Sequence, residues 1–309
     1  MSAGLAQSAR RSWVVPAIGA GLIALAALSE PRLAIVLALW IGAWGLNIVL
    51  SRGTETAAIR LAVPVIFGLT LLAIWEVTVR LYEISPIILP APSQIAQAFA
   101  ANTDILWADF QQTILKGALS GYVMGCGLAF LTALAVDKSN FLQRGLLPVG
   151  NFIAALPIVG TAPILVMWFG FGWESKAAVV VAMVFFPMLV NTVSGLKATD
   201  AMQRDLMHTY AANYGQSLVK LRLMNALPFI FNGLKICTTL ALIGAIVAEF
   251  FGSPTVGMGF RIKIEVGRLA MDMVWAEITV AALAGSGFYG LMALIEKRLT
   301  FWHPSQRRH

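Results

Sequence analysis

The chain has 309 residues, of which 59% are hydrophobic and only 12% charged, and its mean hydropathy is +0.79. Soluble domains carry roughly 25% charged residues, so this composition excludes an ordinary soluble protein and indicates an integral membrane protein. The two cysteines, Cys126 and Cys237, both lie inside apolar runs, which excludes a disulfide-stabilised secreted domain. The net charge of +7 would, taken alone, suggest a nucleic-acid partner.

Eight apolar runs approach the roughly 20 residues of helix that a bilayer core about 30 Å thick requires. In chain order they are residues 13–28, 33–50, 61–79, 114–136, 146–171, 177–196, 234–251 and 274–295. The fifth run is interrupted by Pro157, Gly160 and Pro163, which predicts a broken helix. The sequence therefore predicts an all-α integral membrane protein with about eight spans, or seven if the first two runs form a shallow hairpin.

The first apolar run follows Arg10 and Arg11, an arrangement that signal peptides share. The run is longer than the apolar core of a typical signal peptide, and residues 29–32 lead directly into the second run. We therefore expect residues 1–60 to form a retained N-terminal transmembrane hairpin. A cleaved signal peptide is the alternative.

The basic residues give the orientation, because lysine and arginine concentrate on the cytoplasmic side of membrane proteins. If the amino terminus is cytoplasmic and eight spans alternate, about two thirds of the 22 lysines and arginines fall on the inner side. The sequence thus predicts that both termini are cytoplasmic. Because the positive charge follows the topology, no nucleic-acid partner is expected.

Two stretches outside the spans carry local structure. In the outer stretch, residues 80–113, Ser93 follows Pro90 and Pro92 and is expected to cap a short amphipathic helix. The inner stretch, residues 197–234, is the longest cytoplasmic loop and shows helical spacing.

This inner loop is expected to contain two short helices. The first helix passes through Tyr210 and Tyr214 and is ended by Gly215, and the second covers residues 216–227. Two interpretations stay open at this point. The helices dock into a groove of a partner protein, or they form an interfacial pair that only connects two spans.

The same loop resembles the coupling loop of bacterial ABC importer permeases, whose pattern is Glu-Ala-Ala, three residues, Gly, nine residues, Ile, one residue and Leu-Pro. With Gly215 aligned, this chain departs from the pattern at Thr209, Tyr210 and Asn225. The resemblance implies that the loop couples to an ATPase through residues that occupy or adjoin the pattern, namely Thr209, Tyr210, Ala211, Tyr214, Gly215, Leu227 and Pro228.

Three further stretches resemble the permeases of nitrate, sulfonate and taurine importers, in the same order and with similar spacing. They are Trp75-Glu76 followed by Leu89-Pro90-Ala91-Pro92-Ser93, the proline-broken stretch 157–172, and Ala248-Glu249 followed by Gly257-Met258-Gly259-Phe260. The resemblance covers about residues 61–300. It implies a type I ABC importer permease fold with a six-helix core, in a permease domain over residues 61–309, to which the hairpin 1–60 is added.

The resemblance also implies partners and a location. A cytoplasmic ATP-binding subunit would hold ATP and Mg²⁺, and this chain itself has no GxxxxGK[ST] phosphate-binding loop. A second copy of the permease and an external solute-binding protein would complete the importer in a bacterial inner membrane. The solutes of this branch are small anions such as nitrate, sulfonates, taurine and bicarbonate, or vitamin-precursor pyrimidines.

Charged residues within spans are functional candidates by default, and three acids lie toward the outer ends of spans: Glu76, Glu249 and Glu277. For Glu249, hydrogen bonding within the outer turn is favoured over contact with solute. Because broken helices often line cavities, the candidates for a translocation pathway are Asn151, Pro157, Pro163, Asn191 and Glu249. Small residues at every fourth position predict close helix packing at Gly117, Gly121 and Gly125.

The sequence shows no catalytic or metal-binding cluster. The three histidines are assigned to the cytoplasmic side, and no pair of cysteine or histidine residues has the spacing of a zinc site. We therefore expect a non-catalytic membrane subunit. The alternative is a stand-alone secondary transporter or channel, which would leave the folded loop 197–234 without a purpose.

Overall fold

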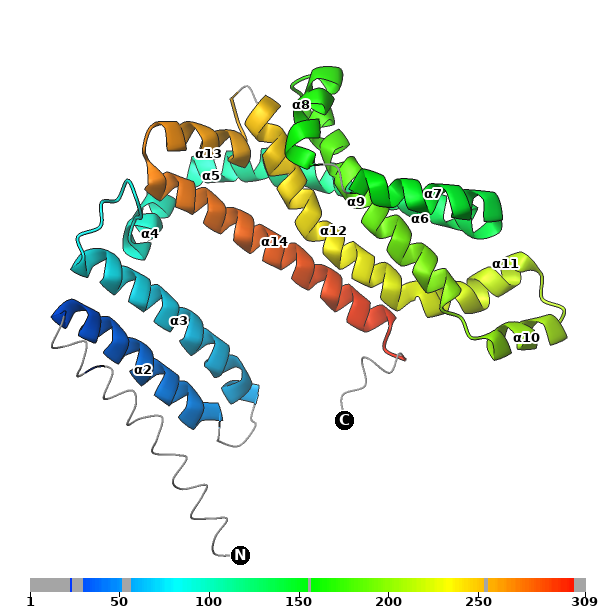
Figure 1. The fold of residues 1–309 in the computed structure, drawn as a ribbon, viewed down its shortest axis with the longest axis horizontal. Helices are drawn as coiled ribbons and strands as arrows, with labels where there is room; N and C mark the ends of the chain where they lie inside the picture. The colour runs from blue at the N-terminus through cyan, green and yellow to red at the C-terminus, as the bar shows by residue number, and fades with distance from the viewer. Residues whose placement is uncertain (1–22, 24–29, 52–56, 155–156, 253–254, 303–309) are drawn as a thin grey trace, which may run out of the picture. The chain divides into compact units, whose positions relative to one another are not determined.

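The computed structural model describes residues 23, 30–51, 57–154, 157–252 and 255–302, and every regular element in this part of the chain is a helix (Figure 1). The helices form two compact units. One unit is Met1–Ala101 with Leu269–Asp272, and the other is Asn102–Arg268 with Met273–His309. The predicted all-α class is confirmed.

The first unit contains α2 (Pro31–Ser51) and α3 (Ala57–Leu81), which pack against each other, followed by α4 (Pro92–Ala101). Helix α4 begins one residue before Ser93, because proline suits the first helical position. The prediction that Ser93 caps this helix is therefore wrong. Instead, the Ser93 N–H and hydroxyl both donate to the carboxylate of Glu76, at 2.9 and 2.8 Å.

The second unit carries the remaining helices. They are α5 (Thr103–Phe110), the π-helical η1 (Gln111–Ala118), α6 (Leu119–Lys138), α7 (Asn140–Ala154), α8 (Ile158–Phe169), α9 (Trp173–Lys197), α10 (Ala201–Thr209), α11 (Tyr214–Ser217), the π-helical η2 (Leu218–Arg222), α12 (Leu223–Gly252), α13 (Met258–Gly267) and α14 (Met271–Leu299). The first two residues of α14 cluster with the first unit.

Six helices in the described part are long and apolar enough to cross a membrane. They are Pro31–Val49, Leu61–Leu81, Thr103–Lys138, Trp173–Lys197, Tyr214–Gly252 and Met271–Leu299. The predicted first span lies outside the described residues except for Ile23. The predicted fifth span is divided between α7 and the short apolar α8, which begins directly after Pro157. Pro163 lies inside α8 and does not interrupt it.

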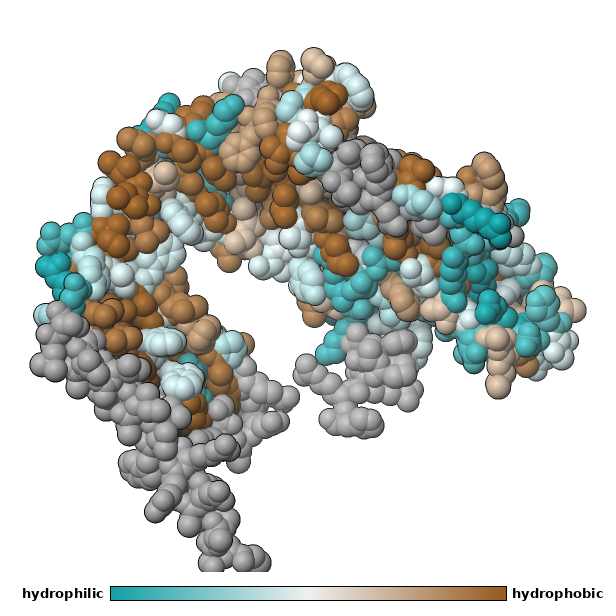
Figure 2. Space-filling view, in the orientation of Figure 1, coloured by the Kyte–Doolittle hydropathy of each residue, from teal (hydrophilic) through white to brown (hydrophobic). Residues whose placement is uncertain are grey.

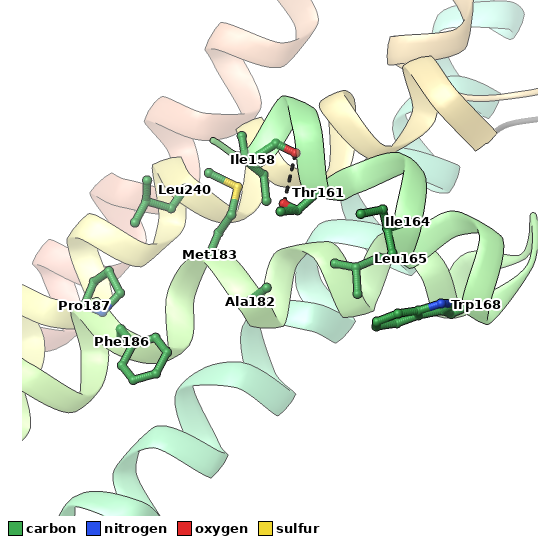
Figure 3. Close-up of a pocket in the computed structure, with 10 residues that line it drawn as sticks. All are labelled: Ile158, Thr161, Ile164, Leu165, Trp168, Ala182, Met183, Phe186, Pro187 and Leu240. Atoms are coloured by element: carbon green, nitrogen blue, oxygen red, sulfur yellow. Dashed lines mark hydrogen bonds between the residues drawn. The ribbon is translucent and has the colours of Figure 1, made fainter. Parts of the chain in front are cut away.

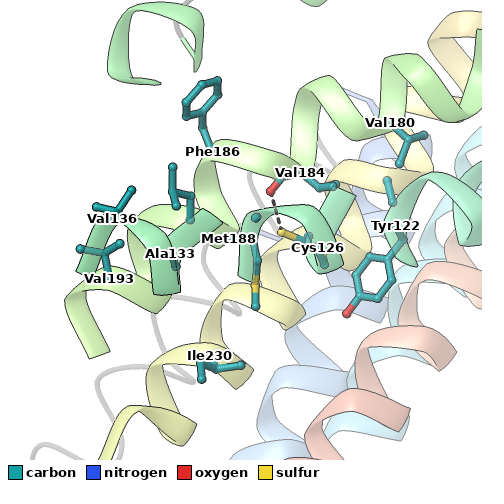
Figure 4. Packing of buried hydrophobic residues seen from close by; sticks show 14 of the residues in the cluster. Tyr122, Cys126, Ala133, Val136, Val180, Val184, Phe186, Met188, Val193 and Ile230 are labelled. Atoms are coloured by element: carbon teal, nitrogen blue, oxygen red, sulfur yellow. Dashed lines mark hydrogen bonds between the residues drawn. The ribbon is translucent and has the colours of Figure 1, made fainter. Parts of the chain in front are cut away.

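Helices α6, α9 and α12 form the core of the second unit, and small residues allow them to approach closely (Figure 4). Gly121 and Gly125 of α6 face Val180 and Val184 of α9. A Cβ atom added at Gly121 would lie 2.5 Å from the Cβ of Val180. Gly117 faces the stem of Lys176, where an added Cβ would lie 3.3 Å away. Because a methyl group would not fit at Gly121, the backbone of α6 lies directly against α9, and this contact fixes the position of the two helices.

The loop 197–234 differs from its predicted structure. Helix α10 ends at Thr209, and Ala211 has a positive φ of 51°, which turns the chain. Asn213 then caps a new helix, because its side chain accepts the Gln216 N–H at 2.9 Å while Gln216 Oε1 accepts the Asn213 N–H at 3.0 Å. Gly215 is therefore the second residue of a helix, and the prediction that it ends one is wrong.

The second predicted boundary, at Leu227-Pro228, is also absent. α11, η2 and α12 are consecutive, and Pro228 lies inside α12. A proline inside an apolar helix is tolerated where neighbouring helices and local π-helical adjustments satisfy the freed backbone groups. The helix that starts at Tyr214 consequently runs from the polar loop to Gly252 without a break.

Candidate functional site

The segment formed by α10, α11 and η2, residues 201–222, stands out because none of its helical residues is buried. Figure 2 shows hydrophilic side chains gathered at the end of the second unit that carries α10 and α11. We call residues 201–222 the exposed segment. Its polar surface places it in water, beside the ends of the apolar helices.

An apolar stripe crosses this polar segment. Met202, Leu206 and Tyr210 are 77%, 54% and 75% exposed, and they follow one another at intervals of four residues. Side chains four residues apart lie on the same face of a helix. α10 thus presents Met202 and Leu206 on one face, and Tyr210, the residue directly after the helix, continues the row. Amphipathic helices anchor in a groove of a partner through side chains at this spacing.

Side-chain hydrogen bonds attach the exposed segment to the membrane helices, and Arg222 makes most of them. The guanidinium of Arg222 donates two hydrogen bonds to Asp137 at the end of α6, at 2.8 and 2.5 Å, and two to the carbonyl of Leu196 at the end of α9, at 3.3 and 3.1 Å. The hydroxyl of Tyr214 also donates to Asp137, at 2.8 Å. Near the start of α12, Asn225 donates to Gln203 of α10 at 2.9 Å.

The residues predicted to couple to an ATPase fall in three places. Thr209 ends α10, and its hydroxyl donates to the carbonyl of Asp205 at 3.0 Å. The turn between the two helices contains Tyr210 and Ala211, and α11 contains Tyr214 and Gly215. The last two predicted residues are half-buried inside α12, away from the exposed segment: Leu227 and Pro228.

Sequence reasoning missed Met202, Leu206, Asp137 and Arg222. The four-residue spacing of Met202, Leu206 and Tyr210 was a readable signal for one helix face. The ion pair carried no such signal, because its partners are 85 residues apart in the sequence.

A second polar cluster lies where α12, α13 and η1 meet. The carboxylate of Glu249 accepts the N–H of Gly259 at 2.9 Å, and the hydroxyl of Thr113 lies 2.9 and 2.8 Å from its two oxygens. The same hydroxyl accepts the N–H of Met258 at 2.8 Å. Glu249 is only 1% exposed. It therefore holds the start of α13 against η1 and is enclosed by its hydrogen-bond partners.

Two more buried charged side chains, Asp109 and Lys176, belong to this cluster. Asp109 accepts the N–H of Gly257 at 2.6 Å and pairs with Arg261 at 2.9 Å. The ammonium of Lys176 donates to the carbonyl of Phe171, at 2.7 Å, and to that of Gly252. Lys176 also interacts electrostatically with Glu249. The cluster thus ties together the ends of α5, α9 and α12.

An apolar groove of about 560 Å³ lies between α8, α9 and α12 (Figure 3). The only polar group that Figure 3 shows bonded there is the hydroxyl of Thr161, which donates to the carbonyl of Ile158 at 3.3 Å. No charged side chain is among the residues that line the groove, namely Ile158, Thr161, Ile164, Leu165, Trp168, Ala182, Met183, Phe186, Pro187 and Leu240.

None of the predicted pathway residues is among the described residues that line this groove. Pro157 and Pro163 belong to α8 or its first cap, beside Ile158 and Ile164, which line the groove. Asn191 donates to the carbonyl of Pro187 at 2.8 Å and accepts from Asn232 at 3.0 Å. Glu249 belongs to the polar cluster. Asn151 lies in α7, and its side chain is outside the described part of the chain.

The described residues contain no group of three histidine, cysteine or acidic side chains placed to hold a metal ion. The two candidate features of the second unit are therefore the exposed segment and the apolar groove.

Residues 121–301 match the family described as binding-protein-dependent transport system inner membrane component. The chain belongs to this family. The match includes the exposed segment, the three helices around the groove, and the Glu249 cluster except for its α5 and η1 members. It confirms the resemblance to ABC importer permeases and the type I permease fold.

Curated relatives align with this chain over most of their own length. A probable ABC transporter permease protein of Haemophilus influenzae is 32% identical over 72% of this chain and 90% of its own length. The formylaminopyrimidine transport permease protein ThiX of Halalkalibacterium halodurans is 30% identical over 79% of this chain and 96% of its own. The taurine transport system permease protein TauC of Escherichia coli is 30% identical over 75% of this chain and 86% of its own length. This chain is accordingly a multi-pass membrane protein and a transmembrane subunit of an ATP-driven importer.

Proposed function

We propose that the exposed segment docks into a groove of a separate cytoplasmic ATPase, which binds ATP and Mg²⁺, and that this chain converts closure of the ATPase into movement of its membrane helices. The stripe of Met202, Leu206 and Tyr210 carries this proposal, because three exposed apolar side chains on a water-facing helix need a partner. We infer that this segment lies on the cytoplasmic side, and we propose the same side for both termini.

The family description supports a further partner. Its members are binding-protein-dependent transport components of the inner membrane, so we propose an external solute-binding protein as another subunit. We also propose that a second copy of this chain belongs to the importer. A stand-alone transporter would not require the stripe. Dependence of uptake on ATP hydrolysis by a copurifying subunit separates the two functions.

Replacing Leu206 with aspartate tests the docking surface. The side chain is exposed, so the folded chain loses little stability, but a charge in the middle of an apolar anchor is left desolvated on docking. We expect Leu206→Asp to lower the amount of ATPase that copurifies in mild detergent by about tenfold or more, in line with the loss of a central anchor residue.

Ala201→Asp is the matched control, because it adds the same charge to α10 at an exposed position off the stripe. Equal recovery of the ATPase with both variants would contradict docking through the stripe. If no ATPase copurified with the unchanged chain or with either variant, the proposed function itself would be contradicted.

For the solute, we propose a small uncharged heteroaromatic compound that passes along the apolar groove. Some relatives are named for heteroaromatic solutes, formylaminopyrimidine and riboflavin, and others for the sulfonates, taurine and aliphatic sulfonates. An anion in a groove without a charged or strongly polar lining would lose its hydration without replacement. Trp168, Phe186 and Met183 offer aromatic and sulfur surfaces that suit a flat ring.

Substitution of Trp168 by alanine tests this choice. The indole is exposed at the mouth of the groove, so its removal leaves the packing intact while it takes away the largest surface for stacking. We expect uptake of formylaminopyrimidine to fall about three- to tenfold, the loss of one aromatic contact. Trp40→Ala, at an exposed tryptophan of α2, should leave uptake unchanged. Competition by taurine, and not by the pyrimidine, would contradict the assignment.

A further inference from the structure

The contacts of Arg222 bring three parts of the second unit to one point. Asp137 is the penultimate residue of α6, Leu196 is the penultimate residue of α9, and Arg222 is the last residue of η2. Nη1 and Nη2 of the guanidinium donate to Asp137 of α6, while Nε and Nη2 donate to the carbonyl of Leu196 of α9. The end of the exposed segment is therefore attached to α6 and α9 together.

The attachment is specific in geometry and shielded from water. Two parallel bonds from one guanidinium to one carboxylate are directional as well as strong, and a lysine cannot reproduce them. The Asp137 side chain is 5% exposed and that of Arg222 is 16% exposed. Among the ion pairs between described residues, this is the one that joins the exposed segment to the membrane helices.

The position of the pair along the helix adds a second argument. Arg222 ends a π-helical stretch, and α12 follows it directly. π-helical turns inside longer helices occur frequently at functional positions. A force applied to α10 and α11 reaches α12 through this turn and α9 through the linker 198–200. The Arg222 side chain adds a direct connection to the ends of α6 and α9, beside the Tyr214 hydrogen bond to α6.

We propose that Asp137 and Arg222 are positioning residues that make α6 and α9 follow the exposed segment when the ATPase moves it. The proposal rests on the docking function above. Without the pair, the segment still binds the ATPase through its apolar stripe, but α6 and the end of α9 follow its movement less completely, because only the Tyr214 hydrogen bond and the linker 198–200 still connect them to it. ATP hydrolysis then continues while the membrane helices respond less.

The test uses the chain in complex with its copurified ATPase, with Trp168→Cys as a reporter in the groove. The native cysteines are buried and leave the reporter as the accessible thiol among the described residues. Three quantities are measured: the amount of bound ATPase, its rate of ATP hydrolysis, and the change that ATP with vanadate causes in maleimide labelling of the reporter. This readout requires no knowledge of the solute.

Arg222→Lys and Asp137→Asn are expected to keep the bound ATPase and its hydrolysis, while the nucleotide-driven change in labelling falls by about fivefold or more. The double variant should be no worse than either single variant, because both remove the same interaction. Tyr214→Phe removes one hydrogen bond to Asp137 and should give a smaller change in the same direction, so the test does not depend on the more disruptive variants folding.

Lys235→Gln is the matched control. It breaks a similar partly buried ion pair, at 2.6 Å from Glu296, which joins α12 to α14 and does not touch the exposed segment. The role of the pair would be overturned if the nucleotide-driven change in labelling were as large in Arg222→Lys as in the unchanged chain. It would also be overturned if Lys235→Gln reduced that change as much as Arg222→Lys does. Absence of an ATPase from the unchanged chain would instead overturn the proposed function.

Discussion

Gly121→Ala is expected to be among the most destabilising single-methyl changes in the chain. The added Cβ would lie 2.5 Å from the Cβ of Val180 and 2.8 Å from the carbonyl oxygen of Ala177. Both atoms belong to the first part of a long helix in the core, so α6 must move away from α9 to admit the methyl group. We expect a loss of about 3 kcal/mol in stability, at the upper end of overpacking costs, measured as a lower unfolding temperature in detergent.

Gly127→Ala provides the control on the same helix. Nothing lies within 4 Å of a Cβ at that position, and alanine favours helix over glycine by about 1 kcal/mol. Gly127→Ala should therefore raise the unfolding temperature slightly while Gly121→Ala lowers it. Combining Gly121→Ala with Val180→Ala should recover only a small part of the loss, because the second change removes the Cγ1 atom at 2.7 Å but leaves the Cβ of residue 180 and the carbonyl oxygen of Ala177. Equal behaviour of the two glycine variants would contradict close packing at Gly121.

The apolar spans were predictable because their signal is local. A run of about 20 apolar residues must be helical in a bilayer, whatever its neighbours are, and α3, α9 and α14 lie where their runs are. The glycine spacing on α6 was readable for the same reason. The residues that face these glycines could not be predicted, because Val180 and Val184 belong to a helix more than fifty residues away in the sequence.

The ends of helices were harder to predict, because a residue such as glycine or proline has more than one use. Gly215 was expected to end a helix, yet the reciprocal bonds of Asn213 and Gln216 start one just before it. Pro228 was expected to end the next helix, yet the chain continues through it. The capping pair was visible in the sequence, but the glycine gave the stronger apparent signal. The tendency of glycine to end a helix was overridden by the capping box that runs from Asn213 to Gln216.

The buried polar contacts lay furthest beyond sequence reasoning. Glu249 was recognisable as a charge near the end of an apolar run, but Thr113 and Lys176 were not recognisable as its neighbours. Charged groups so placed are stable only when every donor and acceptor finds a partner, and these partners come from four different helices. Their arrangement is a property of the packed unit and makes the cluster sensitive to single changes.

Glu249→Leu is expected to produce the largest loss of stability in this cluster. The leucine cannot accept the N–H of Gly259 or bond to the hydroxyl of Thr113. It also removes one of the two acids, Glu249 and Glu174, that interact electrostatically with the buried ammonium of Lys176. Removal of one member of a buried charged group costs about 3–5 kcal/mol, chiefly because the other charge stays buried. We expect a steep drop in the unfolding temperature and in the yield of monodisperse protein.

The contribution of the stranded cation can be separated from that of the lost hydrogen bonds. Combining Glu249→Leu with Lys176→Met removes both charges, so the double variant should be more stable than Glu249→Leu alone. Glu265→Gln, which loses an ion pair to the exposed Arg268, should cost less than about 1 kcal/mol. If the double variant were less stable than Glu249→Leu, the cation would have been held by the carbonyls of Phe171 and Gly252 alone. In that case Glu249 would act only through its hydrogen bonds to the start of α13.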